Sequence, residues 1–104
     1  MAQTPRMAQI EALLADDPDD VMLRYMLGME HVSAGDDAGA VRVYRELLAK
    51  NPYVPAYHMA GQALNRLGRD AEAAEVLRQG IAAAKAAGDL HAAGEMEALL
   101  ATIE

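Results

Sequence analysis

Three polar side chains have types and a spacing that could bind a metal ion. His58 and His91 have the spacing i, i+33, and Glu95 follows His91 by one helical turn. Imidazole nitrogens and a carboxylate belong to the ligand set that zinc accepts, so the three could share one ion if two helices bring them together. Ordinary surface histidines account for the same residues, and no cysteine or fourth ligand completes the set. The sequence therefore predicts no metal and no cofactor.

The remaining chemistry-bearing residues do not predict catalysis. The chain has no cysteine, Ser33 is its only serine, and no glycine-rich phosphate-binding loop follows a strand pattern. No nucleophile, base and orienting group are therefore found together. The acidic segment 16–20 lacks the spacing and closing glutamate of a calcium-binding loop. It is typical of a loop that places negative charge at a helix N-terminus. We expect a protein that is not an enzyme.

Length, charge and hydropathy limit the classes of partner. With 104 residues the chain is expected to form a single domain, and its net charge of −7 argues against nucleic acid and anionic membranes as partners. No apolar run reaches the roughly 18 residues that a membrane span needs. The first residues do not resemble a signal peptide. The sequence therefore predicts a cytoplasmic protein.

The composition favours helices, and the helices are repeated. Alanine, leucine, glutamate, arginine and methionine dominate, and these are the strongest helix formers. Small side chains recur at the spacing i, i+33, as expected for one supersecondary unit that is repeated. The recurring positions are Gly28, Gly61 and Gly94, then Gly35 and Gly68, then Ala40 and Ala73.

The repeat predicts an all-α fold of about six helices, alternating between a first helix (A) and a second helix (B) of each unit. The expected helices are B at 5–15, A at 20–34, B at 37–50, A at 55–67, B at 70–87 and A at 89–102. Gly35, Gly68 and Gly88 are expected to end helices in the left-handed conformation, and Asp89 to cap the last one.

The opening helix has the pattern of a B helix without its A helix. Its apolar residues lie 34 positions before the corresponding apolar residues of the next B helix. Ile10, Leu13 and Leu14 correspond in this way to Tyr44, Leu47 and Leu48. The single domain, 1–104, is therefore divided into an N-terminal half-repeat helix (1–17), repeat 1 (18–52), repeat 2 (53–87) and a C-terminal capping helix (88–104).

These units resemble the tetratricopeptide repeat (TPR), whose pattern is W-x2-L-G-x2-Y, then A-x3-F, then P. The first unit matches at Leu27-Gly28, Ala40-x3-Tyr44 and Pro52, the second at Ala60-Gly61 and Ala73-x3-Leu77, and the third at Ala93-Gly94. Arg24 and His31 replace large apolar residues of the pattern. The resemblance implies a helical solenoid whose A helices line a concave surface that binds another protein or a peptide.

Gly61 lies inside a helix, where glycine costs about 1 kcal/mol relative to alanine. The resemblance supplies a reason, because Gly61 and Ala73 would let the A and B helices approach closely. A larger side chain would overpack that contact, so we expect Gly61→Leu to destabilise the fold more than Gly39→Leu.

The candidate partner-binding residues are those that the resemblance assigns to the concave face: Met22, Tyr25, Met26, Met29, His58, Met59, Gln62, Asn65, Arg66, His91 and Glu95. Methionine adapts to varied apolar ligands, so the methionine stripe could form an open groove. It could equally pack against neighbouring helices. Two functions follow from these alternatives: a module that binds a peptide or partner helix, or a homodimer that buries the methionine-rich face or one end of the array.

Overall fold

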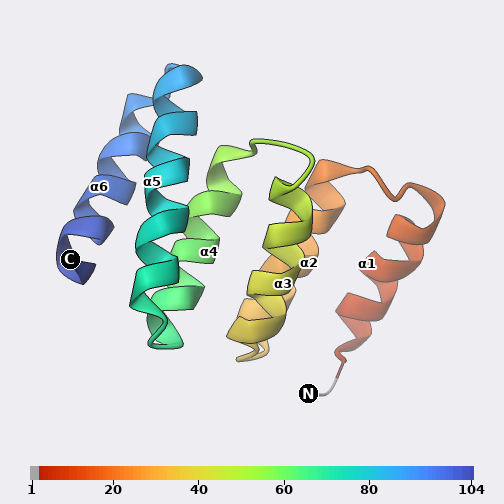
Figure 1. Ribbon diagram of the computed structural model, residues 1–104. Coiled ribbons are helices and arrows are strands. Elements are labelled where there is room, and N and C mark those ends of the chain that lie inside the picture. Colours follow the sequence, from red (N-terminus) through yellow and green to blue (C-terminus); the bar gives the residue numbers. More distant parts are fainter. Residues whose placement is uncertain (1–2) are drawn as a thin grey trace.

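The computed structural model describes residues 3–104, which form six helices and no strands (Figure 1). The helices are α1 (Pro5–Asp16), α2 (Val21–Ser33), α3 (Asp37–Leu48), α4 (Val54–Arg66), α5 (Asp70–Ala86) and α6 (Leu90–Ile103). Neighbouring helices run antiparallel and are joined by short links. The predicted all-α repeat fold and its six helices are confirmed, and each boundary lies close to the expected one.

Local signals in the sequence define the helix ends. Four helices begin after a side-chain cap, in which an oxygen accepts a backbone N–H from the first turn. These caps are Thr4, Asp20, Asp36 and Asp89. Gly35, Gly68 and Gly88 follow helix ends with φ of 77°, 75° and 76°, a conformation open to glycine at no steric cost. The predicted helix-ending glycines and the Asp89 cap are therefore confirmed.

The helices pack as an array in which the A helices α2, α4 and α6 alternate with the B helices α1, α3 and α5 (Figure 1). Each helix contacts its neighbour along the chain, and α4 also contacts α6. The largest fully buried side chains are Tyr44, Leu47, Leu64, Leu77 and Met96. Buried apolar side chains therefore run through the array from α3 to α6.

The repeated glycines explain how closely the A and B helices approach. A Cβ built on Gly28 would collide with the ring of Tyr44, and one built on Gly61 would lie 2.5 Å from Leu77. The close approach expected at Gly61 is present, and Leu77 is the residue that fills it. Gly39 is not an open site for comparison, because a Cβ there would collide with the side chains of Asp36 and His31.

Arg24 and His31, the two residues that depart from the repeat pattern, form polar contacts within the fold. Arg24 donates from Nη2 to the carbonyl of Pro18 at 2.8 Å, which ties α2 to the preceding link. His31 Nδ1 lies 3.0 Å from Asp36 Oδ2, and both side chains are largely buried. Asp36 Oδ1 also accepts the backbone N–H of Gly39 at 2.9 Å. One carboxylate therefore caps α3 and joins it to the end of α2.

Asp36→Ala is expected to lower the free energy of unfolding at neutral pH by about 0.5–2 kcal/mol, the usual cost of losing an N-terminal cap. The hydrogen bond from Gly39 and the neighbouring His31 lower the pKa of Asp36 below its ordinary value of 3.8. A lowered pKa stabilises the fold above that value, and the stabilisation is lost as the pH falls through the folded-state pKa. Urea unfolding of both proteins at several pH values should show their difference shrinking below pH 3.8. A difference that stays constant throughout the acid range would contradict this role.

Candidate functional site

A pocket lies where the three A helices meet, and it contains four of the predicted binding residues. Its volume is about 170 Å³, and it opens to solvent. The lining residues, here called the A-helix pocket, are Tyr25 from α2, Val54, Pro55, His58 and Met59 from α4, and Asp89, Ala92 and Glu95 at the start of α6. Side chains from two repeats and the capping helix therefore converge on one site.

Tyr25 forms a rigid wall of the A-helix pocket. Its ring packs edge-on against Tyr53, with centroids 5.2 Å apart, and at a tilt against Tyr44, with centroids 5.9 Å apart. Burial, together with the nearby Tyr53, raises the pKa of Tyr25, so its hydroxyl stays neutral near pH 7. Aromatic contacts of this kind hold a side chain in one orientation. Tyr25 therefore presents a preformed, uncharged surface to the pocket.

The polar side chains of the pocket lie mainly on α4 and α6. His58 Nε2 lies 3.4 Å from Gln62 Nε2 one helical turn away, so a hydrogen bond between them has the Gln62 amide as donor. Glu95 Oε1 lies 3.5 Å from His91 Nε2, which is strongly exposed. Asp89 Oδ1 accepts the backbone N–H of Ala92 at 3.1 Å. The pocket thus combines apolar walls with two carboxylates from the α6 end.

Two exposed methionines extend the apolar surface along α2. The side chains of Met22 and Met29 are 51% and 42% exposed, among the most exposed large apolar side chains in residues 3–104. They stand three positions before and four positions after Tyr25, which places all three on one stripe of the helix. The stripe leads into the A-helix pocket through Tyr25. Asn65, another predicted binding residue, is exposed near the end of α4.

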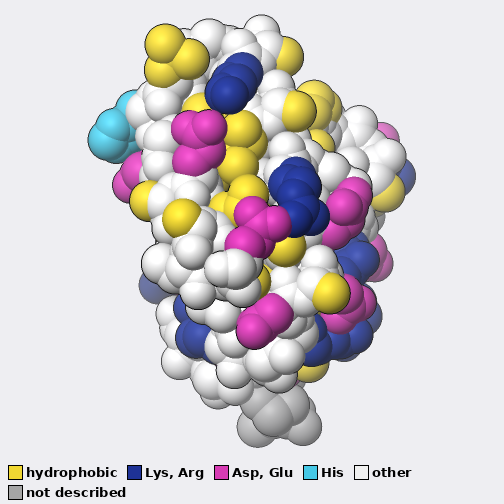
Figure 2. All heavy atoms as spheres, turned by 60° about the vertical axis from the view of Figure 1, so that its left-hand side comes forward, with side chains coloured by type: hydrophobic (Ala, Val, Ile, Leu, Met, Phe, Trp, Pro, Cys, Tyr) yellow, Lys and Arg dark blue, Asp and Glu magenta, His cyan; other side chains and the backbone are white. Residues whose placement is uncertain are grey.

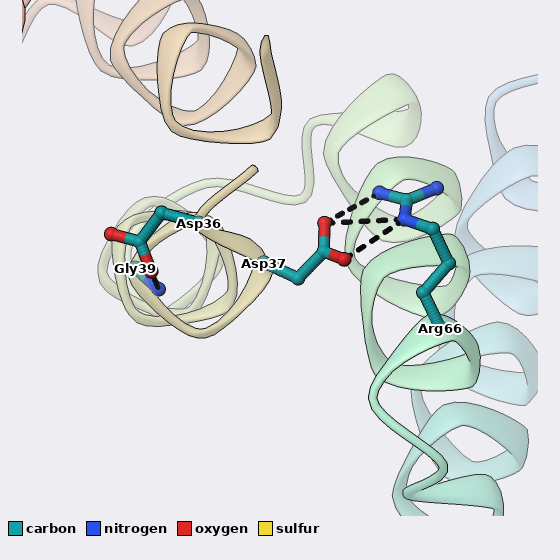
Figure 3. A network of polar contacts seen from close by, with 4 residues as sticks. All are labelled: Asp36, Asp37, Gly39 and Arg66. Carbon is teal, nitrogen blue, oxygen red and sulfur yellow. Dashed lines mark hydrogen bonds and ion pairs between the residues drawn. The ribbon is translucent and has the colours of Figure 1, made fainter. Parts of the chain in front are cut away.

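Two of the predicted residues make structural contacts elsewhere. Met26 packs against the core between α1 and α2 that contains Met7, Ile10 and Leu14. Arg66 holds the carboxylate of Asp37 at the start of α3 with both Nε and Nη2, at distances of 2.8–3.2 Å (Figure 3). That pairing raises the pKa of Arg66 and ties α4 to α3. The structure thus separates these two residues from the pocket.

Four pocket residues were missed from sequence: Val54, Pro55, Asp89 and Ala92. Val54, Pro55 and Asp89 lie at the first turns of α4 and α6. Pro55 and Asp89 were interpreted only as helix starts, and Val54 was expected to lie in the link before the helix. Ala92 stands one turn before Glu95, and this spacing could have identified it. The pocket therefore sits nearer the N-terminal ends of α4 and α6 than the helix faces alone suggested.

The possible zinc site is not supported by the geometry. Within residues 3–104, no three histidine, aspartate or glutamate side chains lie close enough together to hold a metal ion. His91 pairs with Glu95 on its own helix, whereas His58 contacts Gln62. Among the helices of residues 3–104, none combines the length and the hydropathy of a membrane span.

A larger hollow of about 550 Å³ lies on the opposite side of α2, between α1 and α3. Its polar walls include Arg24, His31, Asp36 and Glu46. His31 and Asp36 contact each other, and Arg24 is bound to the carbonyl of Pro18. No predicted binding residue lines this hollow, whereas four of them line the smaller A-helix pocket, which is therefore the better candidate for binding.

The family model for the tetratricopeptide repeat matches this chain at residues 8–55 and 25–89. The chain belongs to the tetratricopeptide repeat family. A TPR repeat-containing protein of Pseudomonas aeruginosa is 30% identical over 96 residues, which cover 91% of each protein. The resemblance inferred from the repeated glycines is therefore confirmed.

Solved TPR structures have the same arrangement of helices. A tetratricopeptide repeat domain protein from Salinibacter ruber superimposes with a TM-score of 0.78 at 28% identity, covering 84% of this chain and 89% of that one. A protein from Bordetella parapertussis gives a TM-score of 0.81 at 27% identity, covering 98% and 89%. TPR folds generally mediate interactions between proteins, and TPR proteins are generally scaffolds without enzymatic activity.

Proposed function

We propose that this TPR protein binds a segment of another protein on the face formed by α2, α4 and α6. The observation that carries the proposal is the A-helix pocket, where Tyr25, His58, Met59 and Glu95 meet. Recessed apolar surface with a few convergent polar groups is the usual character of a binding site. The bound segment would lie along the stripe of Met22 and Met29 and place one apolar side chain in the pocket.

The charges at the pocket favour a basic partner. Asp89 and Glu95 are its two carboxylates, and the whole chain carries a net charge of −7. A lysine or arginine beside the apolar anchor of the partner would meet these carboxylates, and the overall charge would speed its approach. We therefore infer a partner segment that combines an apolar side chain with adjacent basic residues. Nucleic acid and anionic membranes are poor partners for the same electrostatic reason.

The supporting contacts also indicate a site that is formed before binding. Tyr25 is held by Tyr44 and Tyr53, and Met59 packs partly on the central core. Preformed walls reduce the ordering cost of binding, while the more exposed Met22 and Met29 can adapt to the shape of the segment. A cytoplasmic location, which would give access to such partners, stays a prediction from the sequence.

A homodimer that buries the methionine stripe is the second candidate. It is favoured by the same exposure of Met22 and Met29, because an isolated apolar stripe is also suited to self-association. The two functions differ in their response to concentration. Binding of an outside segment leaves this face free in the unbound protein, whereas a dimer through this face would exclude the segment.

The test uses a peptide selected from a random display library on the immobilised protein, followed by calorimetric titration. Met22→Glu combined with Met29→Glu is expected to weaken peptide binding at least tenfold, because the charges disrupt the apolar stripe. The melting temperature should stay nearly unchanged, because both side chains are exposed. Glu95→Lys should weaken a basic peptide and reduce the salt dependence of its binding.

Leu67→Glu is a matched control, because Leu67 is a similarly exposed apolar residue outside the pocket and its stripe. It introduces the same kind of charge and should leave peptide affinity unchanged. Equal losses of affinity in Leu67→Glu and the methionine variant would refute binding at this face. Loss of folding in the methionine variant would instead mean that the stripe is part of a core.

A further inference from the structure

The larger hollow between α1 and α3, here called the α1–α3 hollow, is lined by both residues that depart from the repeat pattern, Arg24 and His31. In repeat 2 the same positions are held by Tyr57, which packs against the central core, and by Leu64, which is fully buried. Repeat 1 therefore has polar side chains where repeat 2 has apolar ones. Such an exchange gives up apolar burial, and exchanges of this kind are expected at functional sites.

The α1–α3 hollow has the size of a small-molecule site. Its volume of about 550 Å³ lies within the range of roughly 300–1,000 Å³ that is typical of ligand pockets. No residue lines both this hollow and the A-helix pocket. Four largely buried apolar side chains form its floor: Met7, Leu14, Leu27 and Val43. An apolar group of a ligand could therefore lie on this floor, separate from the partner-binding face.

The α3 wall of the hollow carries a cation without an ion pair. Eight of the nine lysine and arginine side chains pair with a carboxylate, and Arg42 is the only one that does not within residues 3–104. Figure 2 views the end formed by α5 and α6, where apolar side chains lie among charged ones. There Arg78 pairs with Glu104, and Lys85 pairs with Glu97. Arg42 is thus an exception in a strongly acidic chain.

The guanidinium of Arg42 is suited to a carboxylate, because its planar N–H groups can hold both oxygens at once. Asp36 also lines the hollow, but its carboxylate has other contacts. Its Oδ2 lies 3.0 Å from His31 Nδ1, and its Oδ1 accepts the backbone N–H of Gly39. Arg42 is exposed and could therefore bind a carboxylate from a ligand.

Two glutamates give the hollow negative charge as well. Glu11, on the α1 wall, is exposed and forms no ion pair within the described part of the chain. Glu46, on the α3 wall, has its Oε1 4.0 Å from Nη1 of Arg24, which is a long contact for an ion pair. A positively charged group of a ligand would therefore be attracted to both carboxylates.

We propose that the α1–α3 hollow binds a small zwitterion with an apolar side chain, of the class of short free peptides. Its carboxylate would bind Arg42, its ammonium group would lie near Glu11 and Glu46, and its apolar side chain would cover the floor. An anion alone would be repelled by the two glutamates, and a cation alone would leave Arg42 without a partner. A zwitterion satisfies both kinds of charge.

The test is a calorimetric titration of the full chain with the dipeptide leucyl-leucine, with its N-acetyl form and with its C-terminal amide. Leucyl-leucine should bind, and each blocked form should bind about tenfold more weakly, because each lacks one of the two charges. In a chemical-shift titration the largest changes should map to Glu11, Leu27 and Arg42. No binding at millimolar leucyl-leucine, equal affinity of all three forms, or shifts centred on Tyr25 and His58 would each overturn the proposal.

Two variants assign the charges of the ligand to residues of the hollow. Arg42→Gln should weaken leucyl-leucine about tenfold and have little effect on the amide, which lacks the carboxylate. Glu11→Gln should weaken leucyl-leucine and have little effect on the N-acetyl form. Both residues are exposed, so circular dichroism should show unchanged folding.

Arg45→Gln is the matched control, because Arg45 is an exposed residue of α3 outside the hollow and pairs with Glu72. It removes the same charge from the same helix and should leave the affinity for leucyl-leucine unchanged. Equal losses of affinity in Arg42→Gln and Arg45→Gln, or no loss in Arg42→Gln, would show that the carboxylate does not bind Arg42 and would overturn the proposal.

Discussion

Tyr44→Ala is expected to lower the free energy of unfolding by about 3–5 kcal/mol, the usual cost of removing a large buried aromatic side chain. Tyr44 is fully buried in the central core, where its ring lies over Gly28 and contacts Tyr25. A domain of this size has about 5–15 kcal/mol of stability, so the variant should be markedly easier to unfold. Urea unfolding followed by circular dichroism measures the loss.

Tyr44→Phe removes the hydroxyl but keeps the ring, so it measures the contribution of the hydroxyl to stability alone. The hydroxyl oxygen is buried and has no hydrogen-bond partner among residues 3–104. Burial, as the largest cause, raises the pKa of Tyr44, so the group stays protonated. Because a buried unpaired polar group destabilises a fold, its removal should leave stability unchanged or raise it. A loss above about 1 kcal/mol would show that the hydroxyl has a partner, such as an ordered water molecule.

Gly61→Leu is expected to destabilise the fold by about 1–3 kcal/mol or more, because the new side chain must enter the space that Leu77 occupies. Gly94→Leu is the matched control, since Gly94 holds the same repeat position on α6 with open space beside it. Leucine is a better helix former than glycine, so Gly94→Leu should raise stability by about 0.5–1 kcal/mol.

Melting temperatures of these two variants should be compared at low protein concentration, where self-association does not contribute. The pair changes the same residue types at the same repeat position, so the difference between them reports the contact with the following B helix. Similar shifts for Gly61→Leu and Gly94→Leu would mean that helix propensity, rather than close packing, dominates at this position.

The fold could be predicted from sequence because its main signals are local and repeated. The regular spacing of Gly28, Gly61 and Gly94 identified the unit, and helix-ending glycines such as Gly35 marked its boundaries. The same spacing concealed a difference, however. Gly28 and Gly61 accommodate a neighbouring helix, whereas a Cβ at Gly94 would meet open space, and only the three-dimensional arrangement distinguishes them.

The site was predicted less completely because its side chains come from separate helices. The α2 stripe followed from helical spacing, but the contribution of Pro55 and Ala92 depends on how α4 meets α6. Arg66 was expected to face a partner, yet it pairs with Asp37 on another helix. Helical spacing indicates which face a residue lies on, but not which charged side chain on another helix it meets.

The most direct test of the proposed partner-binding face is a chemical-shift titration of the labelled protein with the library-selected peptide. We predict that the largest shifts map to Tyr25, His58, Met59 and Glu95 and extend to Met22 and Met29, with little change on α3 and α5. Shifts concentrated on α3 and α5, or in the hollow between α1 and α3, would contradict the account and move the binding surface to the opposite side of the array.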